Sequence, residues 1–277
     1  MKQPVAFTLG CDPEFVFIDR RGRVCRADTF LPKAGQIGHD GPLGELRPTP
    51  GQHEDEVVDH LTQLVRQLPN VVARRFPSRL PGGSALIPEA HSETQNLALG
   101  FHIHLGSPLP SFYHEPFLPI LVSALDYFVG IPALLLEDNP RRRLGRSKYG
   151  KPSDVRLGNT VEYRTPGGFL LRHPDYARGA MGIALCVAKS LFMAWGFHRT
   201  TEADVRQKFA MPSPSVVRKF FAQPDAVCKA QSRTILPNIV KSLEKMEFFA
   251  YHQHSIRLFF RYTLLSRQFS PQLLGNW

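Results

Sequence analysis

Apolar and polar residues alternate over short runs in the first third of the chain, which is the pattern of half-buried strands. The clearest runs are FTLGCDPEFVFID at 7–19 and LALGFHIHLG at 97–106. DRRGR at 19–23 predicts a turn, and the Asp40–Gly41 pair predicts a second turn before GELRP. The predicted strands are residues 7–19, 24–30, the segment after Gly41, 84–90 and 97–106, and 158–171 predicts a strand that leads into a turn.

Helical periodicity dominates the rest of the chain. Residues 53–68 begin with acidic residues, which suit the dipole at the start of a helix. Further helices are predicted at 114–137, where Pro116 and Pro132 end or kink the helix, and at 175–198, while the polar segment 138–158 predicts a loop. Strands and helices do not alternate regularly, so the pattern predicts an α+β fold rather than a doubly wound sheet. In 53–68 the apolar residues at helical spacing are Val57, Val58, Leu61, Leu64, Val65 and Leu68, and residues 202–277 are also mostly helical in pattern.

The composition allows a substantial core, since 43% of the 277 residues are hydrophobic. The 34 Lys and Arg exceed the 24 Asp and Glu, so the formal charge is +10 with His neutral. This charge favours anionic partners such as nucleotides, nucleic acid or acidic substrates. It does not choose among them, and a merely solvated basic face is the alternative.

The cysteines and the absence of long apolar runs bear on the setting of the protein. The four cysteines form no Cys-x-x-Cys pair, which argues against a structural zinc site. The start of the chain, MKQPVAFTLG, lacks the apolar centre of a signal peptide, and no uninterrupted apolar stretch reaches the roughly 18 residues of a membrane span. We therefore expect a soluble, cytoplasmic protein with free thiols and no membrane partner.

Four segments place polar residues two positions apart. The pairs are Asp12/Glu14, Glu45/Arg47, His102/His104 and Glu162/Arg164. On a strand, residues i and i+2 point to the same face. Placed on one sheet, the four pairs line a single concave surface with four acids, two imidazoles and two guanidinium groups.

Each pair also has a purely structural alternative. Pro13 is typical of a sheet edge or a strand start, which makes Asp12 a turn residue and Glu14 an edge residue. Glu45/Arg47 and Glu162/Arg164 fit solvated edge pairs or cross-strand salt bridges. His102 and His104 fit buried, hydrogen-bonded imidazoles. The joint occurrence of the four pairs is more informative than any one of them.

The residue types suit a hard divalent cation. Carboxylates favour Mg²⁺ or Mn²⁺, and an imidazole among them is compatible with Mn²⁺ in particular, whereas zinc is disfavoured because no His-Glu-x-x-His motif occurs. Arginines beside such acids suggest phosphate or carboxylate recognition. Phosphoryl transfer from a nucleotide fits this set. Because GxxxxGK[ST] and GxGxxG are both absent, a nucleotide site would be built on the sheet.

Several of these segments together resemble a known family. GCDPEFVFID resembles the first metal-binding strand of glutamine synthetases, GFHIHLG their His-x-His strand and VEYRTPGGFLL their later Glu-x-Arg strand. With GELRP, LDYFVGIP and YGK, the set is most similar to the phage-type COOH–NH2 ligases of the glutamine synthetase and glutamate–cysteine ligase superfamily, over residues 8–175. The resemblance implies a curved, largely antiparallel sheet with helices packed on one side. It also implies a catalytic domain at 1–200 and a mostly helical C-terminal extension at 201–277, separate or part of the same domain.

The resemblance implies an enzyme that uses ATP and Mg²⁺ or Mn²⁺ to phosphorylate a carboxylate, so that an amine attacks the acyl phosphate. The substrates would be small-molecule or peptide acids and amines, and a homo-oligomer is compatible with the family. Position 12 is Asp where glutamine synthetases carry Glu, so its shorter side chain would bind metal through water. The implied roles are metal binding for Glu14 and Glu45 at one ion and for Asp12, His102 and Glu162 at another, catalysis for His104, Arg164 and Arg47, and nucleotide binding for Arg141, Arg142, Arg143, Arg146, Lys148 and Lys151.

Two other functions fit the same residues. The first is a non-catalytic nucleic-acid-binding or virion-associated protein, which the +10 charge supports. The second is a metal-dependent hydrolase that uses the same acids without consuming ATP.

Overall fold

The computed structural model describes residues 6–75, 86–107, 109–137, 150–198, 201–266 and 268–277. The strands are β1 Thr8–Ile18, β2 Val24–Cys25, β3 Ile37–Asp40, β4 Leu43–Leu46, β5 Ile87–Glu89, β6 Glu93–Thr94, β7 Leu97–Ala98, β8 Phe101–Gly106, β9 Val155–Leu157 and β10 Val161–Tyr163. An antiparallel sheet in the order β3–β4–β1–β8–β10–β9 forms one layer. β2 and β5 pair with the far end of β1, and β6 pairs with β7 alone.

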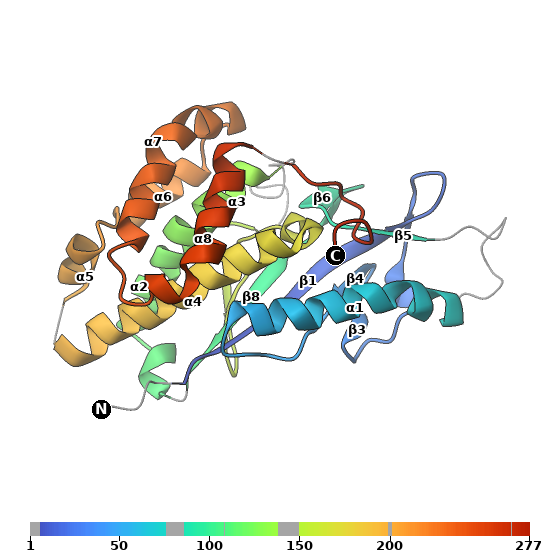
Figure 1. The fold of residues 1–277 in the computed structure, drawn as a ribbon, viewed down its shortest axis with the longest axis horizontal. Coiled ribbons are helices and arrows are strands. Elements are labelled where there is room, and N and C mark those ends of the chain that lie inside the picture. The colour runs from blue at the N-terminus through green and yellow to red at the C-terminus, as the bar shows by residue number, and fades with distance from the viewer. Residues whose placement is uncertain (1–5, 76–85, 108, 138–149, 199–200, 267) are drawn as a thin grey trace.

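The helices form a second layer against this sheet (Figure 1). α4 runs across the molecule and packs against α8, α1 and α2. The α+β class with an antiparallel sheet is therefore confirmed. The helices are α1 Glu54–Arg75, α2 Phe117–Leu125, α3 Ile131–Leu136, α4 Pro174–His198, α5 Glu202–Lys208, α6 Pro214–Phe221, α7 Asp225–Leu243 and α8 Phe249–Leu264.

β1 is the longest strand and occupies the centre of the sheet. Its odd-numbered side chains, such as Cys11 and Phe15, are buried in the main hydrophobic core, so Asp12 and Glu14 point to the other face. Pro13 is the last β1 residue opposite β8, and its partner Phe101 donates its backbone N–H to Pro166 instead (3.0 Å). The ladder opens there, so a central strand accommodates the proline and Pro13 does not mark a sheet edge.

The local structure differs from the pattern-based expectation in several described segments. In 158–171 the strand is limited to Val161–Tyr163, and Gly168–Arg172 forms a 3-10 turn. Residues 24–30 form only the short β2 and then a 3-10 turn, Ala27–Thr29, because Ala27 donates its N–H to Pro42 O and turns inward. The expected helix at 114–137 is α2 and α3 joined by a π-helical turn, Asp126–Gly130. The expected loop at 138–158 contains β9, which is defined by pairing with β10 rather than by its own apolar pattern.

The C-terminal helices share the main core with the rest of the chain. Leu236, Ile239 and Phe259 are fully buried within the same hydrophobic cluster as the sheet residues. α8 approaches α4 so closely that a Cβ on Gly179 would lie 2.4 Å from the Cβ of Phe259. The predicted division into domains at residue 200 stays a prediction. The residues on both sides of it share one hydrophobic core.

Two helical stretches are long and apolar enough to cross a membrane by length and composition alone. They are Phe117–Leu136 and Pro174–Trp195. The fold buries 89% and 83% of their most apolar windows. Core helices pass the same test, so these stretches are weak support for a membrane location.

A buried carboxylate, Asp126, joins the helical layer to the sheet. It accepts hydrogen bonds from Ser153 N (3.0 Å), Ser153 Oγ (2.9 Å) and Tyr163 Oη (2.9 Å). Thr165 Oγ1 lies 3.4 Å away. Burial outweighs these hydrogen bonds and raises the pKa of Asp126 to about 6. The π-helical turn therefore holds β10 and the residues before β9 through one carboxyl group.

We expect the stability contributed by Asp126 to depend on pH. Because its pKa in the folded chain lies above the ordinary value, the folded state retains a proton that the unfolded state loses, and stability falls as the pH rises through about 6. Asp126→Asn keeps an acceptor oxygen but does not titrate. Between about pH 4 and pH 8, the wild type should lose on the order of 2 kcal/mol of unfolding free energy relative to this variant.

Urea denaturation at a series of pH values measures this difference. Asp59→Asn is the control, since Asp59 is exposed on α1 and should leave the pH profile of the wild type unchanged. Parallel profiles for the wild type and Asp126→Asn would contradict a raised pKa at Asp126.

Candidate active site

The register of the sheet gathers the polar pairs on the face away from the main core. Residues opposite each other on antiparallel strands point to the same side. Asp12 lies opposite His102, Glu162 opposite His104, and Glu14 opposite Glu45. The six side chains therefore share one face of β1, β4, β8 and β10.

Asp12, His102 and Glu162 form the centre of this face. One ligand atom from each lies within 4.8 Å of the other two. His102 Nδ1 is 3.2 Å from Asp12 Oδ1 and 3.6 Å from Glu162 Oε1. His104 Nε2 is 3.0 Å from Asp12 Oδ1, and its Nδ1 is 3.0 Å from Thr160 Oγ1. Three strands thus supply one compact set of oxygen and nitrogen donors.

The charges in this cluster are mutually dependent. Burial acts to raise the pKa of Asp12, but His102 and His104 outweigh it and lower that pKa to about 2. Burial acts to lower the pKa of His104, but Asp12 outweighs it and raises that pKa. Asp12 is therefore ionised at neutral pH, which is the form that binds a cation.

Two carboxylate oxygens in the cluster lack hydrogen-bond donors among the described residues, which also suits the binding of a divalent ion. Within the described ranges, Asp12 Oδ1 and Glu162 Oε1 are buried and accept no hydrogen bond of good geometry, although imidazole and guanidinium nitrogens lie 3.0 to 3.6 Å away. Buried carboxylate oxygens without donors cost free energy unless a cation neutralises them. Two carboxylates and one imidazole suit Mg²⁺ or Mn²⁺.

Gly100 supports the position of His102. A Cβ at Gly100 would lie 2.2 Å from His102 Nε2, so only glycine lets the imidazole occupy its place. The Gly100 N–H also donates to Glu14 Oε2 (2.6 Å). This residue therefore orients two proposed ligands at once.

Glu14 and Glu45 lie on the neighbouring strand pair. Glu45 forms a close ion pair with Arg47, whose guanidinium also donates to Gly35 O (3.1 Å) and His39 O (3.4 Å). Both glutamates are buried, with 6% and 7% of their surface exposed. The structure thus places Arg47 beside Glu45, just after β4, where it holds that carboxylate.

Two guanidinium groups flank Glu162. Arg156 Nε lies 2.5 Å from Glu162 Oε2, and Arg164 Nε lies 3.3 Å from Glu162 Oε1. Arg164 Nη1 is also 4.0 Å from Asp154 Oδ1. The Arg156 side chain is 63% exposed, so its guanidinium is open to an anion from solvent.

Arg156 was not among the predicted site residues, because it lies within the loop expected at 138–158. Leu157 pairs with Val161, so residues 158–160 form the turn of a tight hairpin. Gly158 and Asn159 are typical turn residues. A hairpin centred on Asn159 sets Arg156 opposite Glu162, so the Gly158–Asn159 turn signal in the sequence could have identified Arg156.

The predicted nucleotide-binding residues are only partly described. Arg141, Arg142, Arg143, Arg146 and Lys148 lie outside the described residues. Lys151 is exposed, and its backbone carbonyl accepts a hydrogen bond from Thr165 Oγ1 (2.9 Å). Their role in nucleotide binding stays a prediction.

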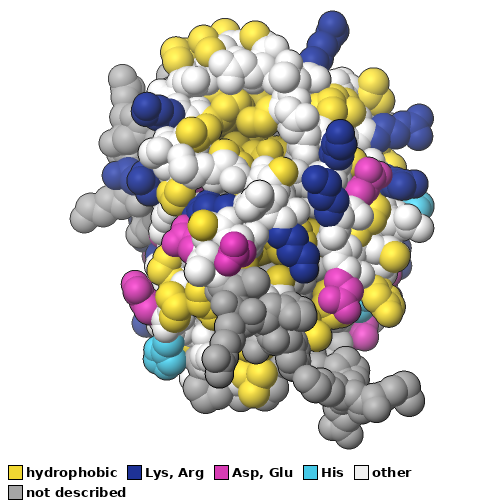
Figure 2. Space-filling model, turned by 90° about the vertical axis from the view of Figure 1, so that its left-hand side faces the viewer, with side chains coloured by type: hydrophobic (Ala, Val, Ile, Leu, Met, Phe, Trp, Pro, Cys, Tyr) yellow, Lys and Arg dark blue, Asp and Glu magenta, His cyan; other side chains and the backbone are white. Residues whose placement is uncertain are grey.

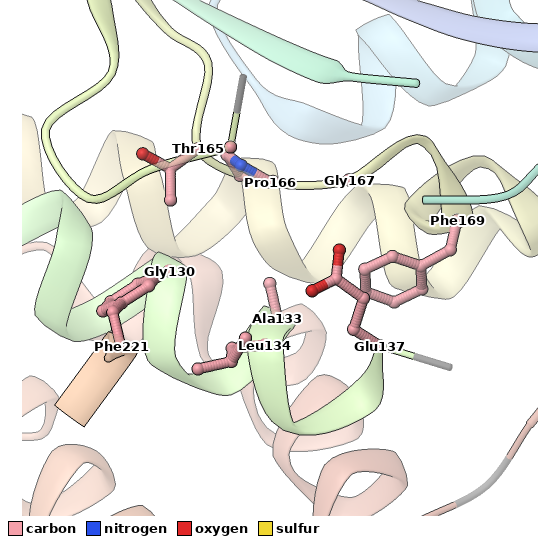
Figure 3. A pocket seen from close by; sticks show the side chains of 10 residues that line it. Gly130, Ala133, Leu134, Glu137, Thr165, Pro166, Gly167, Phe169 and Phe221 are labelled. Carbon is pink, nitrogen blue, oxygen red and sulfur yellow. The ribbon is translucent and has the colours of Figure 1, made fainter. Parts of the chain in front are cut away.

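A small cavity lies on the helical side of the residues that follow β10 (Figure 3). Thr165, Pro166 and Gly167 line it together with residues of α3. Its volume of about 10 Å³ is that of one water molecule. A Cβ on Gly167 would lie 2.7 Å from Glu137 Oε1, which closes this side. The cavity is too small for a nucleotide base.

Two solved structures of similar fold carry the names of a ligase and a synthetase. The structure of the complex between the prokaryotic ubiquitin-like protein Pup and its ligase PafA matches with a TM-score of 0.59 and 11% identity, over 95% of this chain and 64% of that one. A bifunctional glutathione synthetase from Pasteurella multocida matches with a TM-score of 0.51 and 11% identity, over 94% and 48%. The chain thus spans about half to two thirds of these neighbours. At this identity the similarity concerns the fold alone.

The sequence identifies the family within this class. Residues 9–272 match the family described as Phage phiEco32-like COOH.NH2 ligase-type 2. The chain belongs to this family of carboxylate–amine ligases, so the resemblance drawn from its motifs is confirmed. A search of the curated proteins found no match.

We expect Gly100→Ala to weaken metal binding without removing any proposed ligand. The added Cβ would displace the His102 imidazole, and Mn²⁺ affinity should fall by about tenfold or more. Titration of Mn²⁺ followed by electron paramagnetic resonance of the free ion measures this affinity.

Gly158→Ala is the matched control, because a Cβ at Gly158 meets nothing within 4 Å. It should bind Mn²⁺ as the wild type does. Equal affinities of Gly100→Ala and the wild type would argue against His102 as a ligand.

Proposed function

We propose that the protein is an ATP-dependent ligase that joins a carboxylate to an amine through an acyl phosphate. The convergence of Asp12, His102 and Glu162 from three strands carries this proposal. The flanking Arg156 and Arg164 add the positive charge that a transferring phosphoryl group requires. Membership of a carboxylate–amine ligase family supports the same reaction class.

Asp12, His102 and Glu162 would hold one divalent ion, and Glu14 with Glu45 a second. Mg²⁺ or Mn²⁺ bound there would neutralise the charge that develops during phosphoryl transfer. Asp12 is fixed by His102 and His104, so its short side chain keeps one orientation. Arg47 holds Glu45 in place from two positions further along the chain.

The reaction has two displacement steps. A carboxylate oxygen of the acid attacks the γ-phosphorus of ATP, and ADP leaves. The amine nitrogen then attacks the acyl carbon, phosphate leaves, and the nitrogen loses a proton. In this scheme Arg164 and the exposed Arg156 bind phosphoryl oxygens, and His104, which lies beside Asp12, contacts the substrate or the phosphate.

The substrates belong to the classes predicted from the motifs, small-molecule or peptide acids and amines. One neighbour of the same fold is a ligase solved with a protein partner, so peptide carboxylates belong in the substrate panel. Nucleotide-phosphate contacts are assigned to Arg141, Arg142, Arg143, Arg146, Lys148 and Lys151 as part of this proposal.

A nucleic-acid-binding function has less support. On the face shown in Figure 2, Lys and Arg side chains are interspersed with acidic and apolar ones. Nucleic-acid binding through such a surface would also leave the buried carboxylate cluster without a role.

We expect Glu162→Gln to abolish ATP-dependent amide formation. The amide keeps the shape of the side chain but removes the charge that binds the metal and pairs with Arg156 and Arg164. The rate should fall by about 100-fold or more. Phosphate release from ATP, measured with a panel of acids and amines, and mass spectrometry of the product report the reaction.

Glu247→Gln, at an exposed position after α7, is the control and should leave turnover unchanged. Product formation without ATP consumption would favour the hydrolase alternative. Salt-sensitive binding of nucleic acid with no turnover in the panel would favour the binding protein.

A further inference from the structure

A second cluster of metal-ligating side chains lies away from the candidate active site, where α1 meets α8. It consists of His53, Glu54 and His252, and one ligand atom from each lies within 4.8 Å of the other two. Glu54 Oε2 is 2.7 Å from His252 Nδ1 and 3.4 Å from His53 Nδ1. The two imidazole rings are stacked, with centroids 5.0 Å apart.

Glu54 is a buried carboxylate without a permanent cation. Its exposed fraction is 0%, and among the described residues only the two imidazoles place a basic nitrogen within 4 Å of it. Burial acts to raise the pKa of Glu54, but the hydrogen bond from His252 outweighs it and lowers that pKa. The carboxylate is therefore ionised, and a buried charge of this kind is stable only beside a positive partner.

The protein groups do not satisfy the cluster by themselves. Across the described part of the chain, Glu54 Oε1 and His252 Nε2 are buried and have no hydrogen-bond partner. Oε1 faces α4 at Gly182, where a Cβ would lie 2.9 Å from it. A hydrogen-bonded Glu54–His252 pair alone leaves this oxygen unused, whereas a cation bound through Oε1 would satisfy it.

His53 has the surroundings of a metal ligand. Its Nε2 lies 3.4 Å from Tyr251 O, so that nitrogen carries the proton and donates to the carbonyl. Its Nδ1 then carries the lone pair, which accepts a long hydrogen bond from Asp55 N (3.4 Å) and lies 3.4 Å from Glu54 Oε2 and 3.3 Å from Asp55 Oδ2. Histidine ligands of metals commonly donate their second N–H to a carbonyl in this way.

We propose that His53, Glu54 and His252 form a structural zinc site that joins the start of α1 to α8. Two imidazoles and one carboxylate are a ligand set that zinc uses, and Asp55 or water supplies the fourth position. This set has two imidazoles to one carboxylate, whereas the triad of Asp12, His102 and Glu162 has two carboxylates to one imidazole and suits harder ions. No cysteine takes part in this site, so the absence of Cys-x-x-Cys pairs from the sequence does not argue against it.

The first test measures zinc affinity by competition with a chromophoric chelator. His53 is the residue to change, because its side chain is 36% exposed and its loss leaves the buried Glu54–His252 hydrogen bond in place. His53→Gln should bind zinc about 100-fold more weakly than the parent, which is the same protein with His53 unchanged. His254→Gln, which changes an exposed histidine two residues after His252, should match the parent.

Because zinc can also enter the active-site cluster, all these proteins carry Glu162→Gln as a common background. X-ray absorption of the zinc-loaded parent should then show two imidazole ligands. Circular dichroism confirms that His53→Gln is folded. A single imidazole, an unchanged affinity in His53→Gln, or no zinc bound at one equivalent would each overturn the proposal. The readout is metal binding, so failure of the ligase assay has no bearing on it.

Discussion

The antiparallel register of β1, β8 and β10 is the constraint on which the candidate active site depends. It sets Asp12 opposite His102 and Glu162 opposite His104. A slip of one residue in either pairing would turn one strand's polar set into the core and its apolar set toward solvent. Phe101, Ile103 and Leu105 are fully buried on the core face, so the hydrophobic effect fixes the register, and the register fixes the donors.

The same arrangement explains how so many charges occupy one buried face. Asp12 has two imidazoles within 3.2 Å, Glu162 has two guanidinium groups, and Glu45 has Arg47. Each anion is thus compensated locally, yet Asp12 Oδ1 and Glu162 Oε1 keep unused acceptor capacity. The carboxylate charges are thus partly balanced, but some carboxylate oxygens still lack a hydrogen-bond donor in the part of the chain that the structure describes. The site is therefore preorganised for a cation, which can bind without rearrangement of the protein.

The features that the sequence predicts are those that depend on residues a few positions apart in the chain. Spacing of two in Asp12/Glu14 and His102/His104, with apolar residues between, gave both the strands and the shared face. What the sequence did not reveal depends on long-range pairing. β9 has no apolar alternation, because it is a partly exposed edge strand, so Arg156 was hidden in an expected loop. His53 and Glu54 are adjacent, but His252 follows 198 residues after Glu54, and no local pattern links them.

Two buried carboxylates outside the active face join elements that are distant in the sequence, and the groups around each carboxylate determine what it can bind. Asp126 is surrounded by hydroxyl and amide donors from Ser153 and Tyr163, which serve a neutral or a charged carboxyl, so burial raises its pKa. Glu54 has imidazoles instead, which can carry charge or coordinate, so it stays ionised. A neutral carboxyl group such as that of Asp126 requires no counter-charge. The ionised Glu54 carboxylate, at 0% exposure, is stable only with a positive charge nearby. That difference in donor chemistry makes the junction of α1 and α8 a place where a cation binds, and the π-helical turn a place where a proton does.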